Sequence, residues 1–261
     1  MSTARNLSLL CLSIVLLACN AHRQFGDHLY VYYCRKESPT IPIETRVVSV
    51  EETSYCEISD EIFCHPNLEA LLIMRNRTRF KNEYACQPVF QTLFLNDWSM
   101  SFPTQVNNLS QLKYLHIGVS GHSGLTNSIA MPELTTLDVF FTVSPDSLRS
   151  EILSSPQLDS LVLDANTYLN FSSSIHLSEK LRYLKFYGDL SASIDQLTHL
   201  KNLKELTVAT ISDPAATAQS LAKFKSLRRL RIYEADLSRR KEISRELESA
   251  GIRFYGFMPH E

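Results

Sequence analysis

The sequence predicts an α/β solenoid, with a parallel β-sheet along one wall and short helical or irregular segments along the other. Three observations support this fold class. An apolar pattern recurs at a nearly constant interval through most of the 261 residues. That pattern has the two-residue period of a strand, and the stretches between its copies have a three-residue period. Self-similarity at a fixed interval is typical of repeat architectures, in which each unit packs on its neighbours.

A leucine marks the centre of each of eight units, at successive intervals of 22, 22, 22, 24, 23, 22 and 24 residues. One apolar residue follows two positions after this leucine and another precedes it by three. Since alternate side chains of a strand lie on the same side, each unit is expected to contribute a short strand with one buried face. The central leucines are Leu71, Leu93, Leu115, Leu137, Leu161, Leu184, Leu206 and Leu230.

The stretches before the strands change period. In one unit Leu197, Leu200 and Leu203 step by three, and Leu221 and Phe224 begin the same series in the next. Steps of three indicate a loose helical or 3₁₀ turn. Each unit is therefore predicted to be a coil with a strand on one side and a short helical arc on the other. Stacked coils bury an apolar interior that one coil cannot cover.

The pattern Leu-x-x-Leu-x-Leu-x-x-Asn resembles the leucine-rich repeat family. It is complete in two units: Leu158, Leu161, Leu163 and Asn166, and Leu68, Leu71, Ile73 and Asn76. The resemblance implies about 8–9 repeats, with the parallel sheet on a concave face and the helical segments on a convex face. It also implies a column of asparagines that hydrogen-bond the turn backbone between coils. In this sequence the column reads Asn76, Trp98, Ser120, Thr142, Asn166, Asp189, Ile211 and Ala235. Trp98, Ile211 and Ala235 are not expected to make that hydrogen bond in the usual way.

Four segments are expected along the chain. They are a signal peptide at 1–18, an N-terminal tether and disulfide-bearing cap at 19–57, the repeats at 58–237, and a capping helix and strand at 238–261. In the last segment Ser238 is predicted as the helix N-cap and Gly251 as its stop, followed by a final strand around Ile252 and Phe254.

The first segment indicates export. Arg5 and the amino terminus supply positive charge, and the run from Leu7 to Ala18 carries none. Its length suits a signal-peptide core and falls short of the roughly 20 apolar residues that span a bilayer. A buried N-terminal helix is the alternative.

Four of the six cysteines form an even set in the first third of the mature chain, as expected for a disulfide framework in an oxidising compartment. They are Cys34, Cys56, Cys64 and Cys86. The intervals from Cys34 to Cys56 and from Cys64 to Cys86 both equal the repeat length. Cys64 and Cys86 occupy equivalent places in adjacent units, where strands about 4.8 Å apart suit a disulfide. We therefore favour these two pairs. The other connectivities and buried free thiols remain open.

The remaining mature cysteine is Cys19. Leu16-Leu17-Ala18-Cys19 resembles a bacterial lipobox, which implies cleavage before Cys19, a lipid on its sulfur and attachment to the membrane of the cell envelope. Ordinary cleavage after Ala18 or Ala21 is the alternative. It would give a secreted protein, for example a eukaryotic leucine-rich repeat glycoprotein.

Charge and motifs exclude several function classes. Lys and Arg number 26 against 28 Asp and Glu, a net charge of −2, with no long block of one sign. Neither nucleic acid nor another charge-driven partner is therefore expected. No catalytic, phosphate-binding or metal-binding motif is present, and the segment from Gly118 to Leu125 does not have the flanking glycines of a nucleophile elbow. We expect no enzyme and no cofactor.

Binding candidates lie on the concave face, at positions one before, one after and three after the central leucine. They are Phe94, Tyr114, His116, Phe140, Tyr183, Tyr187, Arg229, Arg231, Tyr233, Arg253 and Tyr255. Exposed aromatic side chains are typical of recognition hot spots. The sequence thus predicts recognition of a protein or peptide ligand with an apolar portion and an acidic end. A structural cell-envelope protein is the alternative.

Overall fold

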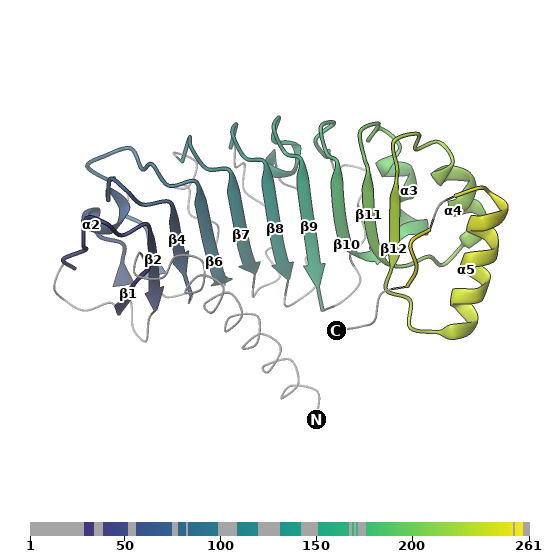
Figure 1. Ribbon diagram of the computed structural model, residues 1–261, viewed down its shortest axis with the longest axis horizontal. Coiled ribbons are helices and arrows are strands. Elements are labelled where there is room, and N and C mark those ends of the chain that lie inside the picture. The colour runs from purple at the N-terminus through teal and green to yellow at the C-terminus, as the bar shows by residue number, and fades with distance from the viewer. Residues whose placement is uncertain are drawn as a thin grey trace, which may run out of the picture.

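The architecture comes from a computed structural model. It describes residues 29–33, 39–51, 56–74, 78–81, 83–98, 109–119, 131–141, 151–166, 169, 171, 176–252 and 254–257. Within these residues one parallel sheet of ten strands runs along the molecule in chain order (Figure 1). Its strands are β1 (Leu29–Tyr33), β2 (Val47–Glu51), β4 (Ala70–Ile73), β6 (Thr92–Trp98), β7 (Tyr114–Val119), β8 (Thr136–Phe141), β9 (Ser160–Ala165), β10 (Tyr183–Asp189), β11 (Glu205–Thr210) and β12 (Arg229–Ile232). Two short strands, β3 (Cys56–Glu57) and β5 (Thr78–Arg79), pair separately.

The register of the sheet confirms the eight predicted strands. Each central leucine pairs with the central leucine of the next unit, from Leu71 with Leu93 to Leu206 with Leu230. All eight of these side chains have an exposed fraction of 0%. The repeat interval therefore measures the path from one strand to the strand beside it.

Two further strands, β1 and β2, extend the sheet into the segment 19–57, where the sequence analysis predicted only a tether and cap. Val48 pairs with Leu71 and Tyr30 pairs with Val48. Val47, Val48 and Val50 are fully buried, so β2 contributes to the same core as the leucine strands.

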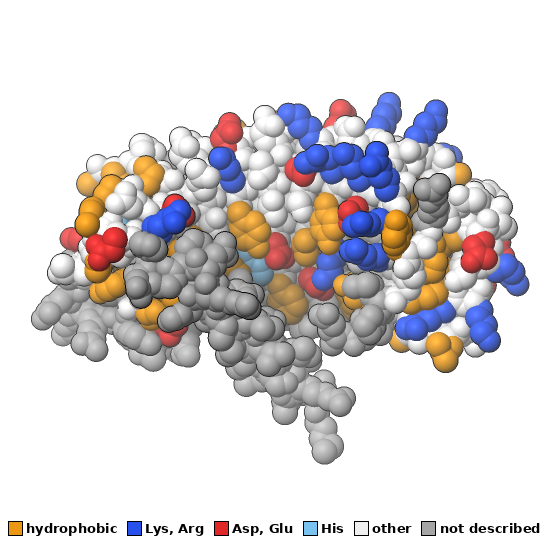
Figure 2. Space-filling view, in the orientation of Figure 1, with side chains coloured by type: hydrophobic (Ala, Val, Ile, Leu, Met, Phe, Trp, Pro, Cys, Tyr) orange, Lys and Arg blue, Asp and Glu red, His pale blue; other side chains and the backbone are white. Residues whose placement is uncertain are grey.

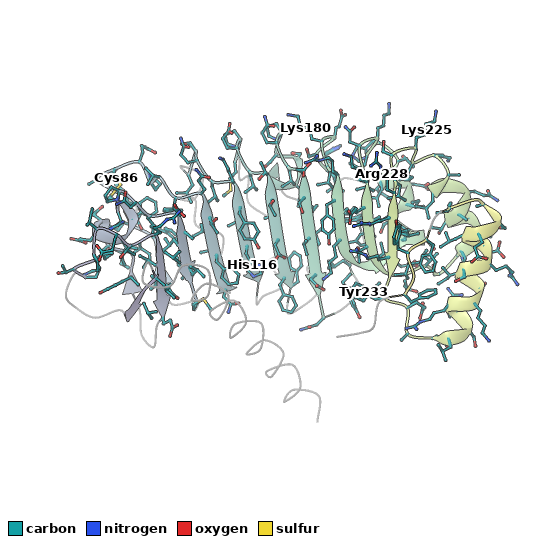
Figure 3. The ribbon with its side chains drawn as sticks, in the orientation of Figure 1. Cys86, His116, Lys180, Lys225, Arg228 and Tyr233 are labelled. Atoms are coloured by element: carbon teal, nitrogen blue, oxygen red, sulfur yellow. A yellow bond between two sulfur atoms is a disulfide. The ribbon has the colours of Figure 1, made fainter. Side chains whose placement is uncertain are left out.

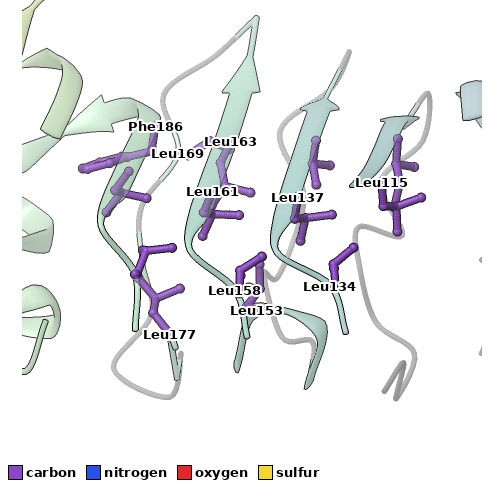
Figure 4. Packing of buried hydrophobic residues seen from close by; sticks show 14 of the residues in the cluster. Leu115, Leu134, Leu137, Leu153, Leu158, Leu161, Leu163, Leu169, Leu177 and Phe186 are labelled. Carbon is purple, nitrogen blue, oxygen red and sulfur yellow. The ribbon is translucent and has the colours of Figure 1, made fainter. Parts of the chain in front are cut away.

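The core is one continuous cluster that runs from Val48 to Leu247. In β8, β9 and β10 buried side chains alternate with half-buried ones, as expected for strands with one buried face. Figure 4 shows the buried row from Leu115 to Phe186, in which side chains of neighbouring strands stack on one another. Each unit thus completes the apolar interior of the next.

Short helices follow or precede the strands. They are α2 (Asp60–Phe63), η3 (Glu151–Ser154), α3 (Leu190–Leu197), α4 (Pro214–Leu221) and α5 (Leu237–Ser249). The predicted three-residue steps are confirmed as 3₁₀-type turns after α3. There the backbone N–H of Leu200 donates to Leu197 O, and that of Leu203 donates to Leu200 O.

The C-terminal helix is present, but its predicted N-cap is wrong. Asp236 is the cap, because its carboxylate accepts hydrogen bonds from the N–H groups of Ser238 and Arg239, which places Ser238 inside the helix. Gly251 does end α5. It has φ 70°, its N–H donates to Glu248 O, and the N–H of Ile252 donates to Leu247 O, the pattern of a glycine stop.

In place of the predicted final strand, the described C-terminal residues form one isolated bridge, between Ile232 and Phe257. Ile252 and Phe254 are half-buried and pack against the core. The chain therefore closes this end of the sheet mainly with α5, whose Ile243 and Leu247 are fully buried.

Candidate functional site

The candidate site is the side of the sheet opposite the core, here called the front face. It carries the side chains one before, one after and three after each central leucine. Figure 3 shows this side of the strands, with His116 and Tyr233 labelled on it. On β8 to β10 these side chains are half-buried, which confirms that they point away from the core.

The first group of front-face contacts joins three neighbouring strands, β6, β7 and β8. The rings of Phe94 and His116 stack with centroids 3.9 Å apart and planes 2° from parallel. On its other side, His116 Nδ1 lies 3.0 Å from Asp138 Oδ2, and the carboxylate accepts this hydrogen bond. This bond fixes the orientation of the imidazole over the Phe94 ring.

Phe94 was predicted to be exposed on this face, but its side chain is buried. Its exposed fraction is 5%, because the His116 ring lies flat against it. The Phe94 ring therefore forms the surface on which the His116 ring packs. Half-buried His116 is the member of this pair that a ligand can reach.

Tyr114 precedes Leu115 on β7 and is half-buried. Burial raises the pKa of its hydroxyl to about 12, and the nearby Asp138 charge adds to the shift. The hydroxyl is therefore protonated at neutral pH and can donate a hydrogen bond.

The second group joins β9, β10 and the residue that follows β12. Lys185 Nζ lies 2.7 Å from Asp164 Oδ2 and 5.6 Å from the centroid of the Tyr233 ring. Burial would lower the pKa of Lys185, but the Asp164 carboxylate outweighs it and the net shift is upward. Lys185 stays charged and holds Tyr233 through a cation–π contact. Lys185 was not among the predicted binding residues, although it obeys the same spacing rule.

The third group lies at the C-terminal end of the sheet. Arg229 Nη1 lies 3.1 Å from Glu205 Oε1, and the Arg229 guanidinium lies 5.5 Å from the centroid of the Tyr255 ring. Tyr255 is 63% exposed. It is the most exposed of the aromatic candidates that the structure describes.

The remaining candidates are placed as follows. Phe140, Tyr183, Tyr187 and Arg231 are half-buried on the front face. Arg253, Cys19 and Cys34 lie outside the described residues, so the predicted pair of Cys34 with Cys56 does as well.

The predicted disulfide between Cys64 and Cys86 is present, with Cα atoms 5.7 Å apart. Next to it, the Phe63 and Tyr84 rings stack with centroids 3.6 Å apart, and Lys81 Nζ lies 2.6 Å from Asp60 Oδ2. The bond thus ties the loop before β6 to the unit before it.

The residues that the structure describes include neither a metal-binding cluster nor a helix that could span a membrane. No three or more of their His, Cys, Asp and Glu side chains are grouped so that they could hold a metal ion. No helix in the described part of the chain is long and apolar enough to cross a membrane.

The fold and the front face define a repeat-like α/β protein built on one all-parallel sheet. No protein-family model matches the chain, and no curated protein matches it either.

Proposed function

We propose that this chain is a non-catalytic leucine-rich repeat protein that recognises a protein or peptide ligand through its front face. In this proposal the front face is the concave face of the solenoid. The observation that carries it is the set of three cross-strand groups, which present His116, Tyr233 and Tyr255 in fixed positions.

Fixed side chains favour binding because less conformational entropy is lost when the ligand arrives. The ion pair of Lys185 with Asp164 and that of Arg229 with Glu205 hold the cations against tyrosine rings before any ligand is present. Tyrosine adds contact area together with a hydroxyl that can hydrogen-bond, so it is frequent at interface hot spots.

The charges on the front face suggest the polarity of the ligand. Asp138 and Asp164 lie in the middle of the sheet, and Arg229 and Arg231 lie at its C-terminal end. Figure 2 shows Lys and Arg side chains gathered over β10 to β12. A ligand with an apolar portion over the tyrosines and an acidic end over β12 matches this arrangement.

The test is selection of peptides from a display library on the full chain, followed by binding measurements with the selected peptides. The triple variant Y183S/Y187S/Y233S should lose binding at least tenfold and remain folded. Y183F/Y187F/Y233F is the matched control. It keeps the rings and should lose much less. Unchanged binding by the serine variant would exclude this face as the site.

We further propose that the protein is anchored to the membrane through a lipid on Cys19. The Cys64–Cys86 disulfide supports the cysteine count behind this proposal. If Cys34 pairs with Cys56, Cys19 is left without a partner. Mass spectrometry of the mature amino terminus should find a lipidated Cys19. A free Cys19, or a chain that begins at His22, would contradict the anchor.

A further inference from the structure

Three cations align across adjacent strands at the edge of the sheet where β10, β11 and β12 begin. Arg182, Lys204 and Arg228 each stand two residues before a central leucine. The backbone N–H of Lys204 donates to Arg182 O at 2.8 Å, and that of Arg228 donates to Lys204 O at 2.8 Å. These residues are therefore direct neighbours, at the spacing of about 4.8 Å between strands.

A second row of cations runs beside the first. Lys201 and Lys225 stand five residues before Leu206 and Leu230, respectively. The equivalent position before Leu184 is Glu179, and Lys180 follows it. The six residues Lys180, Arg182, Lys201, Lys204, Lys225 and Arg228 are here called the cation edge. Five of them are exposed and Lys204 is half-buried. Figure 3 labels Lys180, Lys225 and Arg228 along this edge, and Figure 2 shows the Lys and Arg side chains projecting from it.

Elsewhere along the same edge a neutral or oppositely charged residue stands between like charges, in the order Glu69, Gln91, Lys113, Thr135 and Asp159. Arg46 pairs with Glu69 in the next unit, and Asp159 pairs with Arg182. After Arg182 this arrangement ends. Neither Lys204 nor Arg228 has a carboxylate within 4 Å among the residues that the structure describes.

Like charges directly opposite each other on neighbouring strands are destabilising. Stability of the sheet therefore does not explain why three units in succession carry cations here. An anion from outside the chain would supply the missing counter-charge.

Most apolar residues beside and between these cations point into the core, and Leu227 is half-buried against it. Leu181 and Leu203 have exposed fractions of 0%, Leu200 of 1% and Phe224 of 8%. A surface that inserts into lipid presents exposed apolar side chains among its cations. Among the described apolar residues between these cations, Leu227 alone is partly exposed. The edge is suited to an anion that stays in water.

The edge is also continuous with the front face. Tyr183 follows Arg182, and Arg229, which contacts the exposed Tyr255, follows Arg228. A peptide that lies over the tyrosines can pass over this edge without a break. Arginine binds carboxylates through two parallel hydrogen bonds, which suits aspartate and glutamate side chains.

We propose that the cation edge binds an acidic segment of the protein ligand, with the rest of that ligand on the front face. This inference rests on the proposed function and assigns the acidic end of the ligand to six named residues.

The probe is a fluorescein-labelled octaglutamate peptide, with octaglutamine as the neutral control, added to the full chain and followed by fluorescence anisotropy. The unaltered protein should bind octaglutamate and not octaglutamine, and binding should weaken steeply with salt. The edge variant K201E/K204E/R228E should lose affinity at least tenfold. K113E/K241E/R245E changes the net charge equally and should lose much less. Lys113 lies on the same edge of the sheet but three strands from β10, and Lys241 and Arg245 lie on α5.

Folding of the edge variant is checked by its urea unfolding midpoint, which should stay close to that of the unaltered protein. The substitutions turn the contact of position 204 with Arg182 into an attraction, while positions 204 and 228 still carry like charges. Equal losses in the two variants, or octaglutamate binding that survives K201E/K204E/R228E, would overturn the inference. Neither result bears on the proposed function. That function is tested separately, by the binding of display-selected peptides to the variant Y183S/Y187S/Y233S.

Binding to lipid is measured with vesicles of phosphatidylcholine that contain about one third phosphatidylserine. The variant C19S is used, so that no lipid anchor contributes to this binding. Vesicle binding that requires the cation edge, without octaglutamate binding, would reassign this edge to a membrane surface and overturn the proposal.

Discussion

Asp189 and Ser212 connect two successive units through a hydrogen bond of 3.0 Å, from the backbone N–H of Ser212 to Asp189 Oδ1. The same oxygen accepts a hydrogen bond from the N–H of Ser191 and caps α3. Asp189 stands in the column where the family resemblance predicts asparagine. Its side chain makes the kind of contact to turn backbone that the resemblance implies.

Replacing Asp189 by alanine should destabilise the protein by about 1–2 kcal/mol, because it removes a helix cap and a contact between units. Asn keeps one side-chain oxygen as an acceptor, so D189N should cost less. Urea denaturation gives both values. Exposed Asp195, near the end of α3, offers the control D195A, which should stay within about 0.5 kcal/mol of the unaltered protein. Equal stability of D189A and D195A would contradict the role of Asp189.

Removing the disulfide with C64S/C86S should cost about 3 kcal/mol, since the bond closes a loop of 22 residues. The loss should be local, because each unit contacts only its neighbours. Hydrogen exchange should show faster exchange in β4 and β6 and unchanged protection in β11. Either single substitution should cost about as much as the double, because one sulfur alone forms no bond. Uniform loss of protection along the sheet would contradict this local effect.

Gly188 cannot be replaced without movement of its neighbours. A Cβ atom at this position would lie 2.1 Å from Leu169 O and 2.9 Å from the ring of Phe186. G188A should therefore destabilise the protein by at least about 2 kcal/mol, as overpacking of a core does. Thermal unfolding measures this change. S160A, at a half-buried front-face position, serves as the control and should have little effect.

Stability should also fall at alkaline pH through Tyr114. Its pKa is raised from 10.0 to about 12 in the folded protein, so folding favours the protonated hydroxyl. That contribution is fully present below pH 10, the unfolded value, and is lost as the pH rises through about 12. The ultraviolet absorbance of tyrosinate follows the titration. Comparison with Y114F should reveal one tyrosine that ionises near pH 12. If the tyrosine that Y114F lacks were instead one that ionises near pH 10, the pKa of Tyr114 would not be raised.

Periodic leucines predicted the eight central strands and their register, because a buried strand of a repeat requires an apolar side chain at each interval. The same criterion missed β1 and β2. Val48 stands at the leucine position of β2 and Tyr30 at that of β1, and the step from Tyr30 to Val48 is 18 residues, outside the period. A buried strand without leucine at the expected position and interval is therefore not recognised as part of the repeat from the sequence.

Spacing also predicted which side chains lie on the front face, but not their exposure. Phe94 obeys the spacing rule and is covered by His116, a contact between strands that no single unit reveals. Similarly, Ser238 and Asp236 are both acceptable helix caps. Only the backbone path shows that Asp236 makes the hydrogen bonds.

The net charge of the whole chain did not reveal the cation edge. A net charge of −2 suggested that no charge-driven partner was needed. Stacking of the units places residues about 22 positions apart side by side, so charges that are dispersed in the sequence gather in space. Net charge describes solubility of the whole chain and not the field at one edge.

The agreement between sheet order and chain order has a consequence for how such a molecule changes over generations. Each strand is paired with the strand of the neighbouring unit. Duplication or deletion of 22 to 24 codons would therefore add or remove one whole unit and leave the pairing of the other strands intact. The number of units, and with it the length of the sheet, can therefore change by one unit at a time. Each such step would lengthen or shorten the surface available for recognition, with no need to invent a new fold.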